Sequence, residues 1–278
     1  IHRLLNKVDA QKLKADTRRS VESWRINHFE WALKYIYGIE KDYRLVKVGK
    51  VGCYLHGDGL ANVIHSDGLS NFKNPDYKGR LRCADKDFPQ DNKQFDVVIS
   101  NPPYSVSAFK NAAREYYSRK DFELYERLTD NSSEIECLFI ERTKQLLKDG
   151  GVAGIILPSS ILSNANIYTK AREIILQYFD VIAIAELGSN TFMATGTNTV
   201  VLFLRRRNNY DSINLKKSVN KFFTDLRDVT LNGIGNPVAK YVEYVWVGLT
   251  LRDYISLVQR APNTSVANHE LYQEYRNK

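Results

Sequence analysis

Six short runs rich in apolar and β-branched residues alternate with helical or loop-like stretches along most of the chain. The runs end at Gly, Asp, Asn or Pro, and this alternation predicts an α/β domain with a largely parallel sheet. Because the runs are apolar throughout, we expect the strands to be covered on both faces. The expected strands are residues 35–40, 62–65, 95–100, 152–157, 181–186 and 199–204.

Helices are expected before, between and after these strands. Residues 1–34 are polar and contain no glycine or proline, which predicts a helical lead-in. Ser133 is followed three residues later by Glu136, the spacing of a capping box, and Gly150-Gly151 is expected to end that helix. Two further helices are expected at residues 169–179 and 250–258.

The pattern weakens after Arg207, where three arginines are followed by two asparagines. We therefore expect residues 35–207 to form the main domain and residues 208–278 a small C-terminal extension. Residues 105–132 form a long insertion rich in Tyr, Arg, Lys and Asp directly after a strand. Because long loops in compact domains are usually functional or disordered, the insertion is interpreted as a substrate-facing lid.

Composition narrows the class of protein. With 43% hydrophobic and 26% charged residues the balance is that of a globular protein, and no apolar run approaches the roughly 20 residues that cross a bilayer. We expect a cytoplasmic protein without a membrane segment. The formal net charge of +8 suits a polyanionic partner. Cys53, Cys83 and Cys137 are too widely spaced for a local zinc pair, so we expect buried, reduced thiols and no metal site.

The segment with the most specific chemistry is an apolar strand at residues 95–100 that runs directly into Asn-Pro-Pro-Tyr. Ligands of open α/β sheets bind beyond the carboxyl ends of the strands, where this tetrapeptide is expected to lie. The two prolines fix φ and remove two N–H donors, so that the Asn101 side-chain carbonyl and the Pro102 carbonyl remain as rigid acceptors. Tyr104 adds a flat face on which a base can stack.

Two acceptors and a stacking face suit the exocyclic amine of a nucleobase, since they can hold both of its hydrogens. Such an amine is a poor nucleophile because its lone pair is delocalised into the ring. Positioning and electrostatic stabilisation are therefore expected to dominate, and no general base is required. This makes Asn101, Pro102 and Tyr104 the candidate catalytic residues. The alternative is an ordinary proline-rich turn with a surface tyrosine.

With this motif, the chain resembles the amino-methyltransferase family, and most of all the modification subunits or fused modification domains of type I and related restriction systems. The resemblance covers about residues 35–207. It implies a Rossmann-like class I methyltransferase sheet, S-adenosyl-L-methionine as the cofactor and methylation of adenine N6 in DNA. It also implies that the target adenine is flipped out of the duplex.

Two acidic residues ahead of Asn101 match cofactor contacts of the family. Glu40 matches the residue that holds the ribose hydroxyls, and Asp67 matches the residue that accepts from the cofactor's adenine amine. The resemblance adds Lys41, Gly68 and Asn101 to this cofactor-binding set. Taken alone, Glu40 would be interpreted as a helix N-terminal charge and Asp67 as a turn former.

Two later segments also match the family. Residues 150–158 resemble its fifth strand. Asn190-Thr191-Phe192, followed by residues 197–204, resembles the motif whose aromatic residue packs against the flipped base. The resemblance therefore pairs Phe192 with Tyr104 as the two faces of a base clamp, with a core position as the alternative for Phe192.

One departure from the family is large. The glycine-rich first motif should precede residue 35, yet the first glycine of the chain is Gly38. In this fold the missing first strand lies beside the strands that end near Glu40 and Tyr104, so two unpaired edges are expected. Residues 35–207 are accordingly interpreted as a partial catalytic domain from a longer protein.

The expected partners are double-stranded DNA, a specificity subunit or domain, and a restriction nuclease subunit or domain. Two alternatives stay open. The chain could belong to a methyltransferase of an RNA base or of a protein glutamine amide, because Asn-Pro-Pro-Tyr suits any amine or amide acceptor. It could also be a non-catalytic DNA-binding or assembly module.

Overall fold

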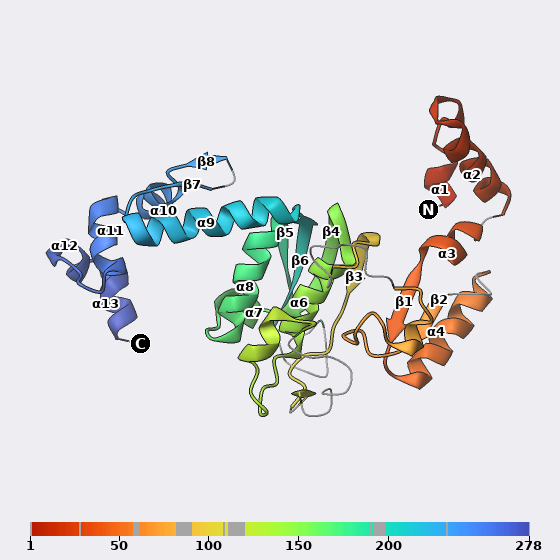
Figure 1. The fold of residues 1–278 in the computed structure, drawn as a ribbon, viewed down its shortest axis with the longest axis horizontal. Coiled ribbons are helices and arrows are strands. Elements are labelled where there is room, and N and C mark those ends of the chain that lie inside the picture. Colours follow the sequence, from red (N-terminus) through yellow and green to blue (C-terminus); the bar gives the residue numbers. More distant parts are fainter. Residues whose placement is uncertain are drawn as a thin grey trace.

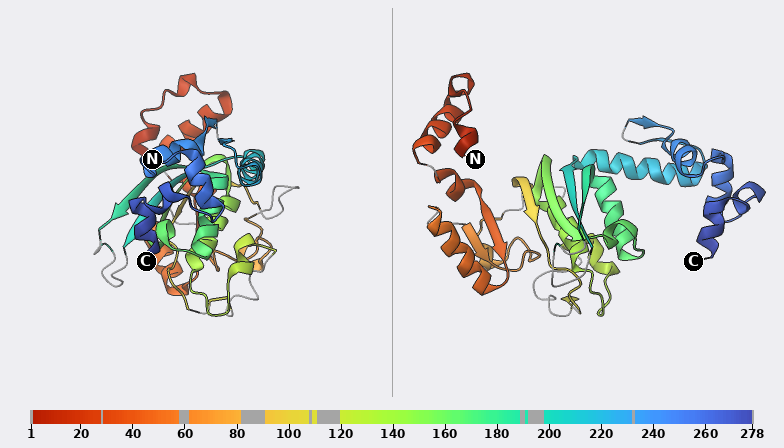
Figure 2. Two further views of the ribbon diagram at one scale, coloured as in Figure 1. Left: turned by 90° about the vertical axis from the view of Figure 1, so that its left-hand side faces the viewer. Right: turned by 180° about the vertical axis from the view of Figure 1, so that it is seen from behind.

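A computed structural model describes residues 2–27, 29–57, 62–81, 91–107, 109–110, 120–188, 191, 198–231 and 233–277. Four parts follow one another along the longest axis of the molecule (Figure 1). They are a group of small helices, a unit of two strands and one helix, a four-stranded sheet with its helices, and a helical C-terminal part. The view from behind shows the same order, with the N- and C-terminal parts far from each other (Figure 2).

The strands form two separate sheets and a small hairpin. β1 (Tyr37–Glu40) is parallel to β2 (Asn62–His65). The larger sheet has the order β3-β4-β6-β5. In it β3 (Phe95–Ser100) is parallel to β4 (Leu147–Pro158), whereas β6 (Thr199–Arg206) is antiparallel to both β4 and β5 (Phe179–Leu187). β7 (Thr230–Leu231) and β8 (Ile234–Gly235) form the hairpin.

The α/β class, the largely parallel direction of the strands and all six expected strands are confirmed. In the larger sheet β3, β4 and β5 run in one direction, and only β6, which lies between β4 and β5, runs in the opposite direction within the part of the chain that the structure describes. The expectation that the strands are covered on both faces is wrong. The β4 side chains alternate between buried and exposed, and Ile99 on β3 is 87% exposed. An apolar run alone cannot distinguish a strand with two covered faces from one with a single covered face.

β1 and β3 each form one of the edges of their sheets. Among the described residues, β1 pairs only with β2, and β3 only with β4. The rings of Tyr37 and Phe95, at the first residues of β1 and β3, lie 5.3 Å apart between centroids. The two strands thus approach each other at their starts without sharing backbone hydrogen bonds, and the two unpaired edges expected from the family resemblance are present.

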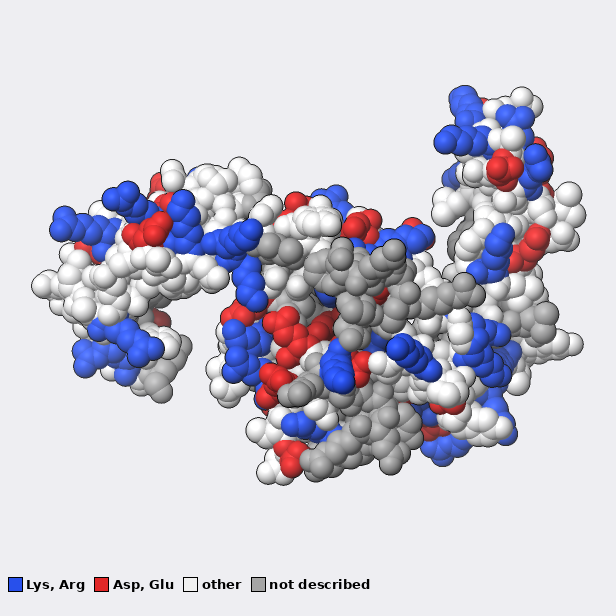
Figure 3. Space-filling model, viewed as in Figure 1, with Lys and Arg blue, Asp and Glu red and all other residues white. Residues whose placement is uncertain are grey.

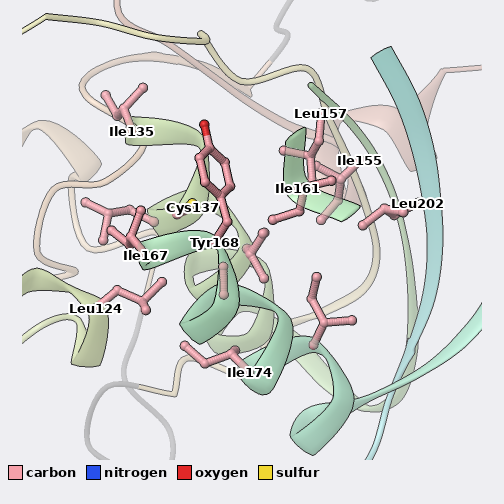
Figure 4. Close-up of a cluster of buried hydrophobic side chains, with 14 of the residues drawn as sticks. Leu124, Ile135, Cys137, Ile155, Leu157, Ile161, Ile167, Tyr168, Ile174 and Leu202 are labelled. Carbon is pink, nitrogen blue, oxygen red and sulfur yellow. The ribbon is translucent and has the colours of Figure 1, made fainter. Parts of the chain in front are cut away.

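The main core lies between the larger sheet and the helices on one of its faces. α6 (Ile135–Leu146) connects β3 to β4, while α7 (Ser160–Ser163) and α8 (Ile167–Tyr178) connect β4 to β5. Figure 4 shows side chains from α6, α8 and the strands meeting in this cluster. A second cluster of Ile64, Phe72, Tyr77 and Leu81, with Tyr37, Ile39, Phe95 and Leu146 packed against it, joins the smaller sheet to the larger one.

The predicted capping box of α6 is wrong. The residue before the helix is Glu134, which makes no side-chain cap, and Glu136 is buried and bonded to other parts of the chain. The helix also ends at Leu146 rather than at Gly150-Gly151, because Leu147 already belongs to β4. Extended backbone from Leu147 onward pairs with Phe95 of β3, and this pairing takes precedence over the glycine signal.

The remaining elements lie at the two ends of the chain and around the smaller sheet, except the 3-10 helix Glu123–Arg127, which packs against α6 and α8. The C-terminal part begins with the long helix α9, which extends away from the larger sheet (Figure 1). These elements are α1 (His2–Leu5), η1 (Ala10–Lys12), α2 (Ala15–Ile26), α3 (Glu30–Tyr35), α4 (Tyr43–Leu55), η2 (Pro75–Tyr77), η3 (Glu123–Arg127), α9 (Asn209–Asp225), α10 (Pro237–Val245), α11 (Leu251–Val258), α12 (Thr264–Ala267) and α13 (Glu270–Arg276).

Three further sequence expectations, on the cysteines, a membrane segment and a lid, can be compared with the structure. Cys137 is a buried free thiol, but Cys53 is only half-buried, and Cys83 lies outside the described residues. Within the described chain, no helix is long and apolar enough to cross a membrane. The expected lid at residues 105–132 is described only at 105–107, 109–110 and 120–132, and its role as a lid remains a prediction.

Candidate active site

The acidic residues expected to contact the cofactor lie at the carboxyl ends of β1 and β2. Glu40 is the last residue of β1, and Asp67 comes two residues after β2. Because the two strands are parallel and paired, their ends lie side by side, and the Ser66 N–H donates to the Glu40 carbonyl at 3.1 Å. Lys41 Nζ bonds Asp67 Oδ2 at 2.8 Å. The predicted set of Glu40, Lys41 and Asp67 is therefore brought together.

The turn that follows Asp67 is fixed by its own hydrogen bonds. Asp67 Oδ1 accepts from the Leu69 N–H at 2.9 Å, which closes a local Asx turn. The Tyr77 hydroxyl donates to the Asp67 carbonyl at 2.6 Å. Burial raises the pKa of Tyr77, so this donor keeps its proton near neutral pH. We refer to residues 67–70 as the cofactor turn.

Helix α6 holds the cofactor turn from the other side. Arg142 Nη2 donates to the carbonyls of Leu69 and Ser70, at 2.7 and 2.9 Å, from a side chain that is 3% exposed. A Cβ added at Gly68 would lie 3.3 Å from the Phe139 ring. Gly68 therefore allows a close approach between the turn and α6, and a side chain at this position would require the Phe139 ring to shift by a few tenths of an ångström.

The Asn-Pro-Pro-Tyr segment leaves the end of β3 as an irregular loop, and we refer to residues 101–105 as the catalytic loop. Pro102 is buried, whereas Asn101 is exposed. The Tyr104 hydroxyl donates to Asn101 Oδ1 at 2.7 Å. Burial, with the charge of Glu136, raises the pKa of Tyr104, which keeps that hydroxyl a donor. The structure thus brings Asn101, Pro102 and Tyr104 together on one loop.

The catalytic loop ends at a residue with unusual backbone geometry. Ser105 has φ of +51°, in the left-handed region that non-glycine residues rarely adopt. Its N–H donates to Glu136 Oε2 at 3.3 Å, and the Tyr168 hydroxyl donates to Glu136 Oε1 at 2.7 Å. This contact could not be predicted from the sequence, because Glu136 and Tyr168 lie 31 and 63 residues after Ser105.

The cofactor turn and the catalytic loop belong to different sheets, and α6 is the element that contacts both. Glu136 holds the loop and Arg142 holds the turn, six residues further along the helix. At a rise of 1.5 Å per residue, these positions are about 9 Å apart along the helix axis. Phe192, the proposed second face of the base clamp, lies outside the described residues.

Charged side chains are distributed unevenly over the surface of the molecule. On the face shown in Figure 3, basic side chains extend from the N-terminal helices to the C-terminal part, and acidic ones gather over the middle. The positive charge is therefore spread out rather than concentrated in one patch on this face. Within the described ranges, no group of three or more His, Cys, Asp or Glu side chains could hold a metal ion.

The combination of an α/β sheet, a paired acidic set after β1 and β2, and an Asn-Pro-Pro-Tyr loop after β3 defines an amino-methyltransferase type of site. The chain belongs to the N-6 DNA Methylase family, whose model matches residues 19–234. This match covers more than half of the chain, including both acidic residues and the whole catalytic loop.

Individual relatives cover parts of the chain. The type II restriction enzyme and methyltransferase RM.Eco57I of Escherichia coli is 30% identical over 195 residues, covering 63% of this chain and 19% of the relative. The methylase subunit of the type I restriction enzyme MpnII of Mycoplasma pneumoniae is 28% identical over 139 residues, covering 50% and 25%. The chain thus spans at most about a quarter of the length of either relative.

Solved structures of similar proteins were also found. The type I restriction-modification system methyltransferase subunit from Streptococcus thermophilus has a TM-score of 0.46 and 22% identity, covering 62% of this chain and 34% of that one. A class I S-adenosylmethionine-dependent methyltransferase from Listeria monocytogenes has a TM-score of 0.47 and 22% identity, covering 68% and 51%.

Proposed function

We propose that the full-length protein containing this chain transfers a methyl group from S-adenosyl-L-methionine to N6 of a flipped-out adenine in double-stranded DNA. The main support for this proposal is the arrangement of the catalytic loop. It presents Asn101 in an exposed position after β3, next to a buried Pro102 and a half-buried Tyr104. Membership of the N-6 DNA Methylase family supports the same assignment.

The acceptor amine needs two hydrogen-bond acceptors in a fixed relation. Asn101 Oδ1 and the Pro102 carbonyl would each accept one of its hydrogens, which turns the nitrogen lone pair out of the base plane and towards the methyl donor. Positive charge then develops on the nitrogen, and the two carbonyl dipoles stabilise it. The proton released from the methylated amine passes to solvent, so no side chain acts as a general base.

The base would bind to an oxygen that already accepts a hydrogen bond. In the structure Asn101 Oδ1 accepts from the Tyr104 hydroxyl at 2.7 Å, which occupies a position that the amine would use. A carbonyl oxygen has two lone pairs, so the amine either shares the oxygen with the hydroxyl or displaces it. Tyr104 then stacks on the base, and Phe192 is proposed to cover the opposite side.

The residues near β1 and β2 fit the cofactor. Glu40 Oε1 accepts from the Asp42 N–H at 2.7 Å, and Oε2 has no donor within the part of the chain that the structure describes. That oxygen would accept from the ribose hydroxyls. Asp67 is exposed by 10% and can accept from the adenine amine in addition to its bond with Lys41. When bound, the cofactor supplies an electrophilic methyl group.

Assembly with other parts of a restriction-modification system is also proposed. Relatives of this chain include a type II restriction enzyme and methyltransferase and a type I methylase subunit, each much longer than the matched region. A specificity subunit or domain would select the DNA sequence, and a restriction nuclease subunit or domain would act on unmodified DNA. Cytoplasmic localisation follows from such a role.

The direct test is methylation of genomic DNA by the full-length protein with its genomic neighbours, using cofactor labelled on the methyl group. Label in N6-methyladenine supports the proposal. Label found only in RNA, or only in a protein glutamine, would move the function to those substrates. Absence of any transfer, with retained DNA binding, would leave a non-catalytic DNA-binding or assembly module as the function.

A further inference from the structure

We propose that Glu136 is a positioning residue that holds the catalytic loop at a fixed distance from the cofactor turn, through the helix that they share. This inference rests on the proposed function, because it assigns the loop and the turn to the acceptor and the cofactor. The proposal follows from the hydrogen bonds that the two oxygens of the Glu136 carboxyl group accept, and from the contacts that α6 makes with the cofactor turn.

The burial of Glu136 requires an explanation. Its side chain has no exposed surface, and it lies between the buried apolar residues Ile135 and Cys137. Burial of a carboxyl group destabilises the fold unless hydrogen bonds offset the loss of water, and an apolar residue would pack there at lower cost. Both of its oxygens are bonded to residues outside α6, so its role lies outside the helix.

One oxygen controls the catalytic loop. The bond from the Ser105 N–H to Glu136 Oε2 falls at the residue with φ of +51°, where a residue with a Cβ is in an unfavourable left-handed backbone conformation. Without an acceptor for this N–H, the backbone would relax to a more ordinary conformation. The loop would then turn differently directly after Tyr104, and the Tyr104–Asn101 pair would lose its present orientation.

The other oxygen fixes Glu136 itself. The Tyr168 side chain extends from α8 into the apolar cluster, and its hydroxyl lies at the edge of this cluster on the side of Ile135 (Figure 4). This hydroxyl donates to Glu136 Oε1 at 2.7 Å. Because the ring is 9% exposed and packed on several sides, it restricts the rotamer of the glutamate. The chain of contacts therefore runs from α8 through Glu136 to Ser105.

The same helix fixes the other half of the site. Arg142 binds the carbonyls of Leu69 and Ser70, and Phe139 packs against Gly68. Glu136 and Arg142 thus set the distance between the acceptor loop and the cofactor turn along one rigid element. A displacement of about 1 Å between reacting groups can lower a rate about 100-fold, so this distance matters for methyl transfer.

The test compares variants of the full-length protein in methyl transfer, cofactor binding and hydrogen exchange. Glu136→Ala should lower kcat about 100-fold and leave the cofactor Kd within about threefold. The backbone amides of Asn101 and of residues 104–107 should exchange at least about tenfold faster. Glu136→Gln still offers an acceptor to the Ser105 N–H, so this variant should keep most of the wild-type kcat and most of the slow exchange of the loop amides. Tyr168→Phe removes only the outer contact and should lower kcat about tenfold.

The matched control is Glu141→Ala. Glu141 is a second buried glutamate of α6 that accepts from two backbone amides, those of Glu123 and Leu124, at 2.6 and 3.1 Å. Since it contacts neither the catalytic loop nor Ser105, its variant should leave exchange of the amides of Asn101 and of residues 104–107 unchanged. Equal acceleration in this control would show that the effect of Glu136→Ala is a general loosening of α6, and would overturn the proposal.

Two other results would also overturn it. One is a Glu136→Ala protein with wild-type kcat and wild-type exchange. The other is a Glu136→Ala protein whose cofactor affinity falls as far as its kcat. If the Glu136→Ala protein does not fold, a Tyr168→Phe protein with wild-type kcat and wild-type exchange would overturn the proposal instead. Failure of the proposed function is seen separately, as a wild-type protein that forms no N6-methyladenine, and the exchange measurements then still decide the role of Glu136.

Discussion

Asn101 is the residue whose loss should affect the chemistry most directly. Asn101→Ala is expected to lower the rate of methyl transfer about 100-fold or more, because the variant cannot orient the acceptor amine. Cofactor affinity should change by only a few fold. Single-turnover rates and titration calorimetry on the full-length protein measure the two effects. A rate near that of the wild type would contradict the proposed mechanism.

Tyr104 has a ring and a hydroxyl with different roles. Tyr104→Phe keeps the stacking face and removes the donor that occupies Asn101 Oδ1, so base affinity should stay equal or rise by a few fold. Tyr104→Ala should weaken base binding by about 1 to 3 kcal/mol, the usual contribution of stacking. Emission from DNA that carries 2-aminopurine at the target position reports extrusion of the base. Equal losses in both variants would show that the hydroxyl, not the ring, is needed.

Glu40 and Asp67 should differ in their effect on the cofactor. Glu40→Ala is expected to weaken cofactor binding by about 1.5 to 3 kcal/mol, because it removes a charged hydrogen bond. Asp67→Ala should be milder, since Asp67 also bonds Lys41 and the Leu69 amide within the protein. Calorimetry on the full-length protein gives both values. Unchanged affinity in both variants would mean that the cofactor lies elsewhere.

At the scale of elements, α6 contains a group that should make stability depend on pH. Burial raises the pKa of Glu141 to about 7, against the opposing effect of the two amides that it accepts from. A raised carboxyl pKa means that the folded state holds its proton more tightly than the unfolded state. The contribution of Glu141 to stability should therefore be fully present below the ordinary carboxyl pKa of 4.5 and be lost as the pH rises towards about 7.

The Glu141→Gln variant isolates this contribution, because it is neutral at every pH. Between pH 4.5 and 7 the wild type should lose on the order of 3 kcal/mol relative to the variant, at about 1.4 kcal/mol for each pKa unit. Urea unfolding at several pH values measures the difference. Parallel stability curves for the two proteins would show that Glu141 titrates as an ordinary exposed carboxyl group.

The positions of helices and strands could be predicted from the sequence where residues within or next to the element determine its ends. β2 and β3 have the predicted bounds, because turn-forming or polar residues flank a short apolar run. α6 was predicted with the wrong start and end. Its spacing of Ser133 and Glu136 matches a capping box, but the bonds of Glu136 reach Ser105 and Tyr168, which only tertiary packing brings near.

The residues of the candidate active site also divide into those that local sequence patterns predict and those that depend on tertiary packing. Glu40, Asp67 and the Asn-Pro-Pro-Tyr segment could be selected because each follows a predicted strand and matches a family motif. Glu136 and Arg142 could not, because a glutamate or an arginine on a helix is most often a solvent-exposed residue. Their roles depend on burial against loops that lie 31 and 72 residues away in the chain.

At the scale of the whole molecule, the open edges of β1 and β3 should promote self-association of the 278-residue chain. Unpaired backbone groups at an edge can pair with another chain. Ile99 on β3 is 87% exposed, so Ile99→Lys should reduce association by adding a charge at that edge. Sedimentation velocity measures this. Phe203→Lys is the control, since Phe203 is 43% exposed on β6, an interior strand of the same sheet.

A reduction by Phe203→Lys as large as that by Ile99→Lys would show that molecules associate through the open face of the sheet. Insensitivity to both changes would mean that the exposed edges do not direct association. The expected result is a strong effect at the edge and a weak one at the interior strand, because only the edge has backbone groups without a partner strand.

The sharing of α6 between the cofactor turn and the catalytic loop has a thermodynamic consequence. If the cofactor restricts motion of α6, the loop is ordered before the base arrives, and the base binds more tightly. Linkage then requires the base to tighten cofactor binding by the same factor. A non-reactive cofactor analogue should therefore act as a positive effector of DNA binding, and Glu136→Ala should reduce this cooperativity even where each ligand alone still binds.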